Sequence, residues 1–176
     1  MWAYIESGNV HTVYRNPKPF TLNSISYPDK VFTLWSDSQR EAISIFPVTA
    51  ATKKDEAYYT LGNPSYSWNS GAKRVTETYS PSARTLSTVK TEQTSRINDI
   101  ATSLIKAYAW LAERKTFANT AIPDAVTTYV AAVRSAASTG KTNIANAANV
   151  DAVASAVNGV SWPDNSNVTS YQRDFR

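Results

Sequence analysis

Cysteine and histidine, two residue types that often act as catalytic nucleophiles or bases, are almost absent from this sequence. The chain of 176 residues contains no cysteine and a single histidine, His11. Composition therefore excludes cysteine catalysis, thiolate zinc sites and any cluster of histidines. His11 lies in a segment with the alternation of a β-strand, and we expect it to have a structural or surface role.

Pairs of carboxylates are the remaining groups that could perform acid–base chemistry, as in glycoside hydrolysis. The candidate groupings are Asp55 with Glu56, and Asp99 with Glu92 or Glu113. All of them lie among lysine, arginine or other polar residues, whereas a carboxyl group needs burial for a raised pKa. We therefore predict that the protein is not an enzyme and that it uses no cofactor and no metal ion.

Motifs for binding phosphate or nucleic acid are incomplete. The run Gly140-Lys141-Thr142 is similar to the end of a P-loop, but Ser135 stands where the first glycine is required. Lys73-Arg74 lies beside Tyr66 and Trp68, but two charges are too few for a strong phosphate footprint. We expect Gly140 to end or break a helix, and we expect no nucleic-acid partner.

The aromatic residues of one predicted hairpin admit two interpretations. Tyr66 and Trp68 alternate on one arm, and Val75, Glu77 and Tyr79 alternate on the other. Such aromatic side chains could form a platform on which sugars stack, as in a carbohydrate-binding host-recognition module. More often they form the core of a small β unit, because aromatic cross-strand pairs hold short strands together.

The first eighty residues have a β-rich pattern. Besides the aromatic hairpin, we predict a hairpin over 2–14 with its turn at 7–9, and two short β runs separated by Pro28-Asp29. Ser36 and Gln39 have the spacing of a capping box. They predict one short helix, which ends before Pro47.

The remaining residues have helical spacing. One long amphipathic helix is predicted over about 84–116, and a second begins at Pro123. A third, shorter helix closes at Asn158-Gly159, in a left-handed C-terminal stop. The sequence thus predicts an α+β fold. A small antiparallel β-rich unit (1–80) precedes a helical unit (85–176), in which a hairpin of two long helices is joined by a shorter third helix and an extended tail.

Composition and charge restrict the class of protein further. The chain has 42% apolar residues, 18% charged residues and a formal net charge of +4, as in globular proteins. It has no run of about 18 apolar residues, so we expect no membrane span. Residues 1–20 lack the pattern of a signal peptide. We therefore expect the chain to stay in the cytosol in which it is made, or to leave it within a larger particle.

A series of residues in the helical part has a distinctive order and spacing. The series comprises Arg96, Trp110, Arg114, Pro123, Tyr129, Ala132-Val133-Arg134 and Trp162-Pro163. In the β-rich part, AISIFPV at 42–48 is followed by a strand near Tyr66 and by VTETY at 75–79. In this arrangement the chain, over about residues 30–163, resembles bacteriophage tail-fibre assembly and tail assembly chaperone-like proteins and a related group of marine phage structural proteins.

The resemblance implies a non-enzymatic protein of the virion tail, made in the host cytoplasm. It would be a structural or connector component of the tail or tail fibres, or an assembly factor for them. Its partners would be other tail or tail-fibre proteins, and a homo-oligomer would suit the rotational symmetry of tails. The alternative function is the carbohydrate-binding module, with Tyr66 and Trp68 as glycan contacts.

Two sets of residues follow from this hypothesis. One set would fix the shape of the helical hairpin: Trp110, Arg114, Pro123, Tyr129, Val133, Arg134 and Trp162. The other would contact a partner, together with the exposed faces of the two long helices: Tyr171, Arg173, Phe175 and Arg176.

Overall fold

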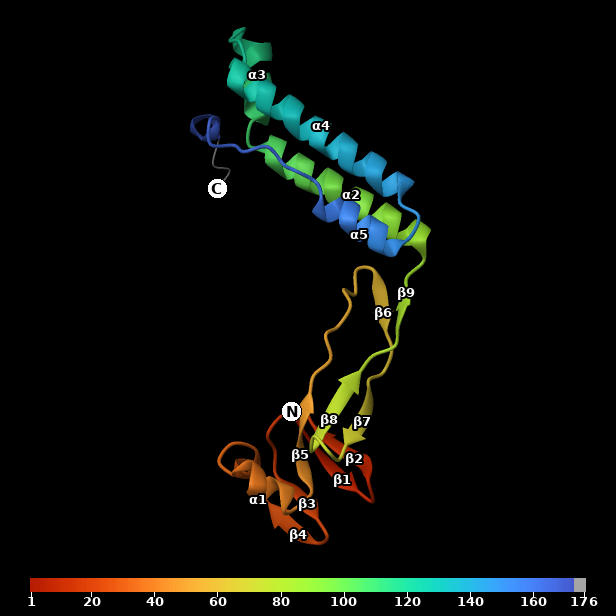
Figure 1. Cartoon of the computed structure of the whole chain (residues 1–176). Helices are drawn as coiled ribbons and strands as arrows, with labels where there is room; N and C mark the ends of the chain where they lie inside the picture. The colour runs from red at the N-terminus through yellow and green to blue at the C-terminus, as the bar shows by residue number, and fades with distance from the viewer. Residues whose placement is uncertain (173–176) are drawn as a thin grey trace. The chain divides into compact units, whose positions relative to one another are not determined.

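A β-rich region precedes a helical region in the computed structural model, which describes residues 1–172 (Figure 1). The predicted α+β fold is therefore confirmed. The chain forms two units, of which the first is Met1–Ser82 and the second begins at Ala83. No helix in the described part of the chain has the length and apolar character needed to cross a membrane.

Five strands of the first unit form one sheet. In spatial order they are β2 (Asn9–Tyr14), β1 (Trp2–Glu6), β5 (Ile45–Thr49), β8 (Arg74–Thr78) and β7 (Ser65–Asn69). Neighbouring strands are antiparallel except β5 and β8, which are parallel, so the sheet is mixed rather than purely antiparallel. The two edge strands, β2 and β7, approach one another, which shows that the sheet curls.

The first predicted hairpin, over 2–14, is confirmed. Ser7 and Gly8, which join β1 to β2, have φ angles of 51° and 79°. A loop of two residues with positive φ matches the twist of paired strands. The aromatic hairpin is also confirmed, with Trp68 opposite Val75 across β7 and β8.

The turn predicted at Pro28-Asp29 lies elsewhere. β3 (Phe20–Leu22) and β4 (Ile25–Tyr27) are joined at Asn23-Ser24, where φ is 48° and 66°. Asparagine tolerates this left-handed geometry well, whereas proline has a fixed negative φ. Pro28 instead precedes a 3₁₀ helix, Asp29–Phe32, so the second predicted β run is wrong.

The short helix α1 (Asp37–Glu41) has the predicted capping box. The backbone N–H of Gln39 donates to Ser36 Oγ at 3.3 Å, and the Ser36 N–H donates to Gln39 Oε1 at 2.8 Å. The helix ends earlier than predicted, because Ser44 takes a φ of 59° and Ile45 begins a strand. Ile45 is fully buried there.

A two-stranded pairing lies where the first unit ends. It joins β6 (Tyr59–Leu61) to β9 (Pro81–Ala83). Helix α2 begins three residues after β9, at Leu86.

Four helices form the second unit: α2 (Leu86–Lys106), α3 (Ala109–Ala118), α4 (Asp124–Asn146) and α5 (Val150–Asn158). The single helix predicted over 84–116 is thus two helices. They meet at Tyr108, whose backbone angles of −107° and −1° depart from α-helical values. Tyr108 is buried edge-to-face against Tyr129, with ring centroids 5.5 Å apart, so tertiary packing outweighs the helical periodicity here.

Two details of the glycines differ from the sequence-based prediction. Helix α4 continues through Gly140, which was predicted to end or break it. A Cβ atom at Gly140 would lie 2.7 Å from Val160 Cγ2, so this glycine permits a close approach of two segments. Gly159 follows α5 with a φ of −82°, so the predicted left-handed stop is wrong.

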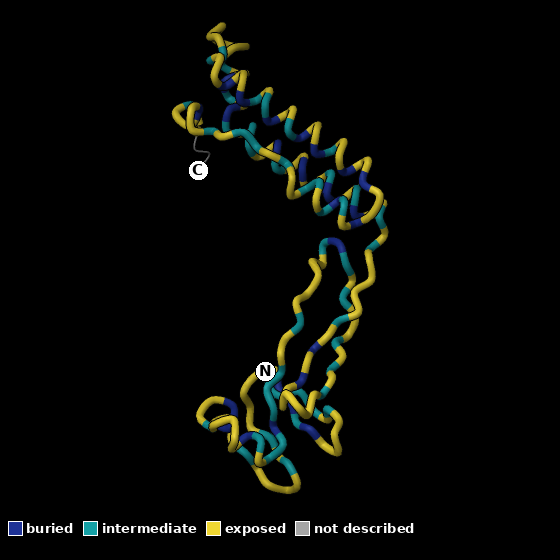
Figure 2. Tube along the Cα trace, viewed as in Figure 1, coloured by how far each residue is buried: buried dark blue, intermediate teal, exposed yellow. Residues whose placement is uncertain are grey.

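The core of the helical unit lies between α2 and α4, where buried residues recur along both helices (Figure 2). Helix α5 packs against both. Fully buried positions include Val89, Ile97, Val133, Ile144 and Val153. The recurrence every three or four residues is the amphipathic pattern that the sequence predicted.

Candidate functional site

Trp110 and Arg114, two of the predicted motif residues, lie one turn apart on α3. The Arg114 guanidinium is 5.1 Å from the centroid of the indole ring. The indole Nε1–H donates a hydrogen bond to the carbonyl oxygen of Tyr171 at 3.1 Å. Gln172 Nε2 donates to the Tyr108 hydroxyl at 3.1 Å. The two hydrogen bonds hold Tyr171 and Gln172 against the beginning of α3.

The predicted partner contacts are therefore only partly described. Tyr171 is half-buried, and its carbonyl oxygen accepts a hydrogen bond from the indole of Trp110. Arg173, Phe175 and Arg176 lie outside the described residues, so their role stays a prediction.

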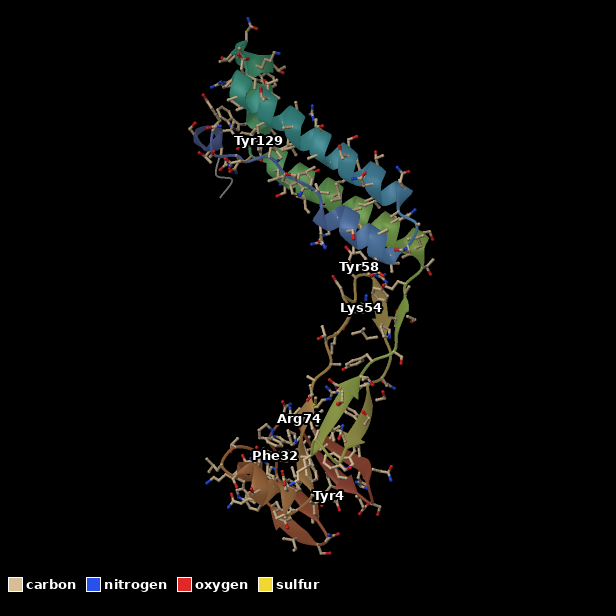
Figure 3. All side chains as sticks on the ribbon, viewed as in Figure 1. Tyr4, Phe32, Lys54, Tyr58, Arg74 and Tyr129 are labelled. Carbon is tan, nitrogen blue, oxygen red and sulfur yellow. The ribbon has the colours of Figure 1, made fainter. Side chains whose placement is uncertain are left out.

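The other motif residues lie on or near α4. Pro123 is its N-cap, just before the first turn, and its carbonyl accepts the N–H groups of residues 126 and 127. Tyr129 (labelled in Figure 3) and Val133 face the core and are buried. Arg134 is exposed on the next position of the helix, and Trp162 is half-buried after α5.

A long apolar depression, which we call the helical groove, lies between α2–α3 and α4. It consists of two adjoining hollows of about 590 and 450 Å³, which share Ile105, Ala109 and Arg134. Small and aliphatic side chains make up most of its lining: Ala101, Ile105, Ala109, Ala112, Ile122, Val126, Val130, Ala131 and Ala137.

Three cationic side chains border the helical groove, and no carboxylate lines it. Lys106 comes from α2, and Arg134 and Lys141 come from α4. Within residues 1–172, none of the three makes an ion pair with a carboxylate. The groove thus combines an apolar floor with positive charge that the described residues do not neutralise.

A polar cluster lies in the first unit, around Glu77, whose side chain is only 3% exposed. The Arg15 guanidinium and the hydroxyls of Tyr66 and Tyr79 donate to Glu77 Oε1 at 3.1, 2.9 and 3.4 Å. The N–H of Ala51 donates to Oε2 at 3.3 Å. Arg15 follows β2, so it joins that edge of the curled sheet to β7 and β8.

These hydrogen bonds set the charge of Glu77. Burial alone would raise the pKa of its carboxyl, but the hydrogen bonds from Tyr66 and Ala51, together with Arg15, outweigh burial and lower it. A carboxylate held in its ionised form by four donors is suited to joining strands rather than to releasing a proton. Burial, reinforced by Glu77, raises the pKa of Tyr66.

Tyr66 and Trp68, the predicted glycan contacts, lie on the face of the curled sheet that carries one of its buried clusters. Both are half-buried and pack against the core formed by Ala3, Ile5 and Val75. The Trp68 and Phe46 ring centroids are 4.3 Å apart. The Tyr66 hydroxyl is held by Arg15 at 2.7 Å and by Glu77. Glycan binding at these residues stays a prediction.

Sequence reasoning overlooked two buried charges in this unit. Glu77 occupies the same face of β8 as Val75, and this alternation was the available signal. Arg40 is 7% exposed, stacks 3.9 Å above the Trp2 ring and donates to Asp37 Oδ1 at 2.6 Å. No local pattern distinguishes Arg40 from an exposed helical arginine.

Three of the residues considered for catalysis, His11, Glu92 and Asp55, make separate local contacts. His11 is exposed, with Nε2 3.7 Å from a Glu6 oxygen. Glu92 pairs with Arg84 at 2.7 Å, and Asp55 accepts the N–H of residue 57 at 2.8 Å. Across residues 1–172, no group of three histidine, aspartate or glutamate side chains could hold a metal ion.

Comparison with protein-family models, with curated proteins and with solved structures finds no match to this chain.

Proposed function

We propose that this protein is a non-enzymatic, bacteriophage tail-associated protein that binds other tail or tail-fibre proteins through its helical unit. The observation that carries this proposal is the helical groove, whose cations form no ion pair with a carboxylate among residues 1–172. It would act as a virion connector of the tail or tail fibres, or as an assembly factor for them. In either case it is made in the host cytoplasm, where assembly begins.

The form of the helical groove supports binding of a protein rather than of a small molecule. Its lining on α4 extends from Val126 to Lys141, which is about 22 Å at 1.5 Å per residue. Small-molecule sites usually enclose most of their ligand, whereas a long open groove suits a segment of a protein partner.

The association with a phage tail is supported by the sequence resemblance described above. Of the residues that carry it, Trp110 donates a hydrogen bond to Tyr171, and Arg114 lies over the Trp110 ring. Tyr129 and Val133 pack in the core. Arg134 has another position, at the edge of the helical groove. The motif thus includes buried residues of the helical unit and one cation at the edge of the helical groove.

Quantitative mass spectrometry of purified phage particles, and of tail precursors isolated during assembly, tests the proposal. A fixed copy number in finished particles is expected of a connector. Presence in precursors alone is expected of an assembly factor. Absence from both fractions would contradict the proposal.

A further inference from the structure

We infer that the helical groove binds an acidic amphipathic helix of the partner protein, an inference that rests on the proposed function. Three properties of the groove define this ligand: its apolar floor, the position of its cations and its length.

The floor of the groove requires an apolar stripe on the ligand. Ile105, Ile122 and Val130 are half-buried in the unbound chain, and Ala109 and Ala131 are exposed. Alanines between larger aliphatic residues leave room for inserted side chains such as leucine. An amphipathic helix supplies such side chains at positions i, i+3, i+4 and i+7, which is the usual pattern for a helix bound in a groove.

The cations require carboxylates beside that stripe. Arg134 and Lys141 are seven residues apart and therefore on the same side of α4, about 10 Å from one another along its axis. Acidic residues seven apart on the ligand would face them both. Lys106 lies on the opposite wall and offers a charge to the other flank of the ligand.

Part of the other side of α4 is covered by the segment that follows α5. Val160 lies against Gly140, and the hollow there is lined by Ala132, Ala136 and Ser161. The side that carries Arg134 and Lys141 has no such cover in the described chain. About 22 Å of groove accommodates roughly four turns of a ligand helix.

A second copy of this chain is a poorer ligand than another protein. Helix α2 does carry Glu92 and Asp99 seven residues apart, as the groove requires. Its apolar stripe, however, is buried against α4 of its own fold. Helix α2 of a second copy is therefore not available as the ligand, and we assign the acidic helix to a different protein.

A synthetic helical peptide tests the inference on the full chain. It is about 18 residues long, with leucines at i, i+3, i+4 and i+7 and glutamates seven residues apart beside them. A matched peptide has lysines in place of the glutamates. Fluorescence anisotropy measures the affinity of each peptide for the wild type, for the double variant Arg134→Glu with Lys141→Glu, and for the control Arg96→Glu. Arg96 is exposed on α2 and does not line the groove.

We expect the glutamate peptide to bind the wild type and the control equally, and the double variant about tenfold more weakly, because both ion pairs become repulsive. The lysine peptide should show the reverse preference.

Equal affinity of the two peptides for the wild type, or no binding of either, would overturn the inference. Presence of both the wild type and the double variant in phage particles would also overturn it while leaving the proposed function intact. Absence of the wild type from particles and precursors would instead contradict the proposed function.

Discussion

At the scale of single residues, Glu77 is the buried carboxylate of the curled sheet. Glu77 is buried yet ionised, because hydrogen bonds from Tyr66, Ala51 and Arg15 outweigh its burial. Its folded-state pKa lies below the ordinary value of 4.5. The stabilisation from this carboxylate is therefore fully present above the unfolded-state pKa and is lost as the pH falls through the folded-state pKa.

Substituting Glu77→Gln should lower the free energy of unfolding of the first unit by about 2 kcal/mol at neutral pH, because Arg15 and the tyrosines lose a charged acceptor. The variant should also lose stability less steeply than the wild type between neutral pH and pH values below 4.5. Urea denaturation across this pH range, followed by tryptophan fluorescence, measures both effects. Glu56→Gln, at an exposed position, serves as the control. Parallel pH profiles for Glu77→Gln and the wild type would contradict this account of Glu77.

Only some of the residues that line the helical groove could be predicted from the sequence. Arg134 belongs to the predicted motif, and the helical spacing of the sequence predicts the helix, beginning at Pro123, on which it lies. Lys106 and Lys141 were not among the predicted site residues. Helical periodicity shows which residues share a face. It does not show which of those faces the rest of the chain will cover.

At the scale of elements, local signals predicted most of the structure well. The capping box at Ser36 and the turn at Ser7-Gly8 both form, because each is satisfied within a few residues. The break between α2 and α3 was missed, because it depends on Tyr108 packing against Tyr129 on another helix. The parallel pairing of β5 with β8 was missed for the same reason, since the two strands are far apart in the sequence.

The close approach of Val160 to Gly140 gives a prediction for the stability of α4. Replacing Gly140→Ala removes a poor helix former but places a Cβ atom 2.7 Å from Val160 Cγ2. We expect the substitution to destabilise the helical unit by about 1 kcal/mol, because the steric cost exceeds the gain in helix propensity. Thermal denaturation followed by circular dichroism at a helical wavelength measures this effect.

The same substitution in a Val160→Ala variant separates the steric cost from the gain in helix propensity. When Val160→Ala is already present, Gly140→Ala should stabilise the unit by about 0.5–1 kcal/mol, because only the gain in propensity remains. The same sign of effect in both backgrounds would show that Val160 does not restrict position 140.

At the scale of the whole molecule, the chain consists of two units with separate cores. The helical unit has its own set of fully buried residues, among them Ile97, Val133 and Ile144. Its helices begin after the division at residue 83. A unit of this size can bury enough apolar surface to fold alone.

A fragment of residues 83–176 should therefore be helical and unfold cooperatively on heating, and its transition should match one of two transitions of the full chain. Circular dichroism and differential scanning calorimetry measure these properties. A fragment without helical signal, or a single shared transition in the full chain, would show that the two units depend on one another.

The central claim is that the protein works by binding another tail protein in the helical groove. Photo-cross-linking during phage assembly tests it most directly, with a benzophenone amino acid at Ala131 in the groove or, as a control, at exposed Thr139 outside it. We expect Ala131, but not Thr139, to give a covalent adduct with an acidic helical segment of a tail or tail-fibre protein, identified by mass spectrometry. Adducts only with a second copy of this chain, or the same adducts from both positions, would contradict the claim.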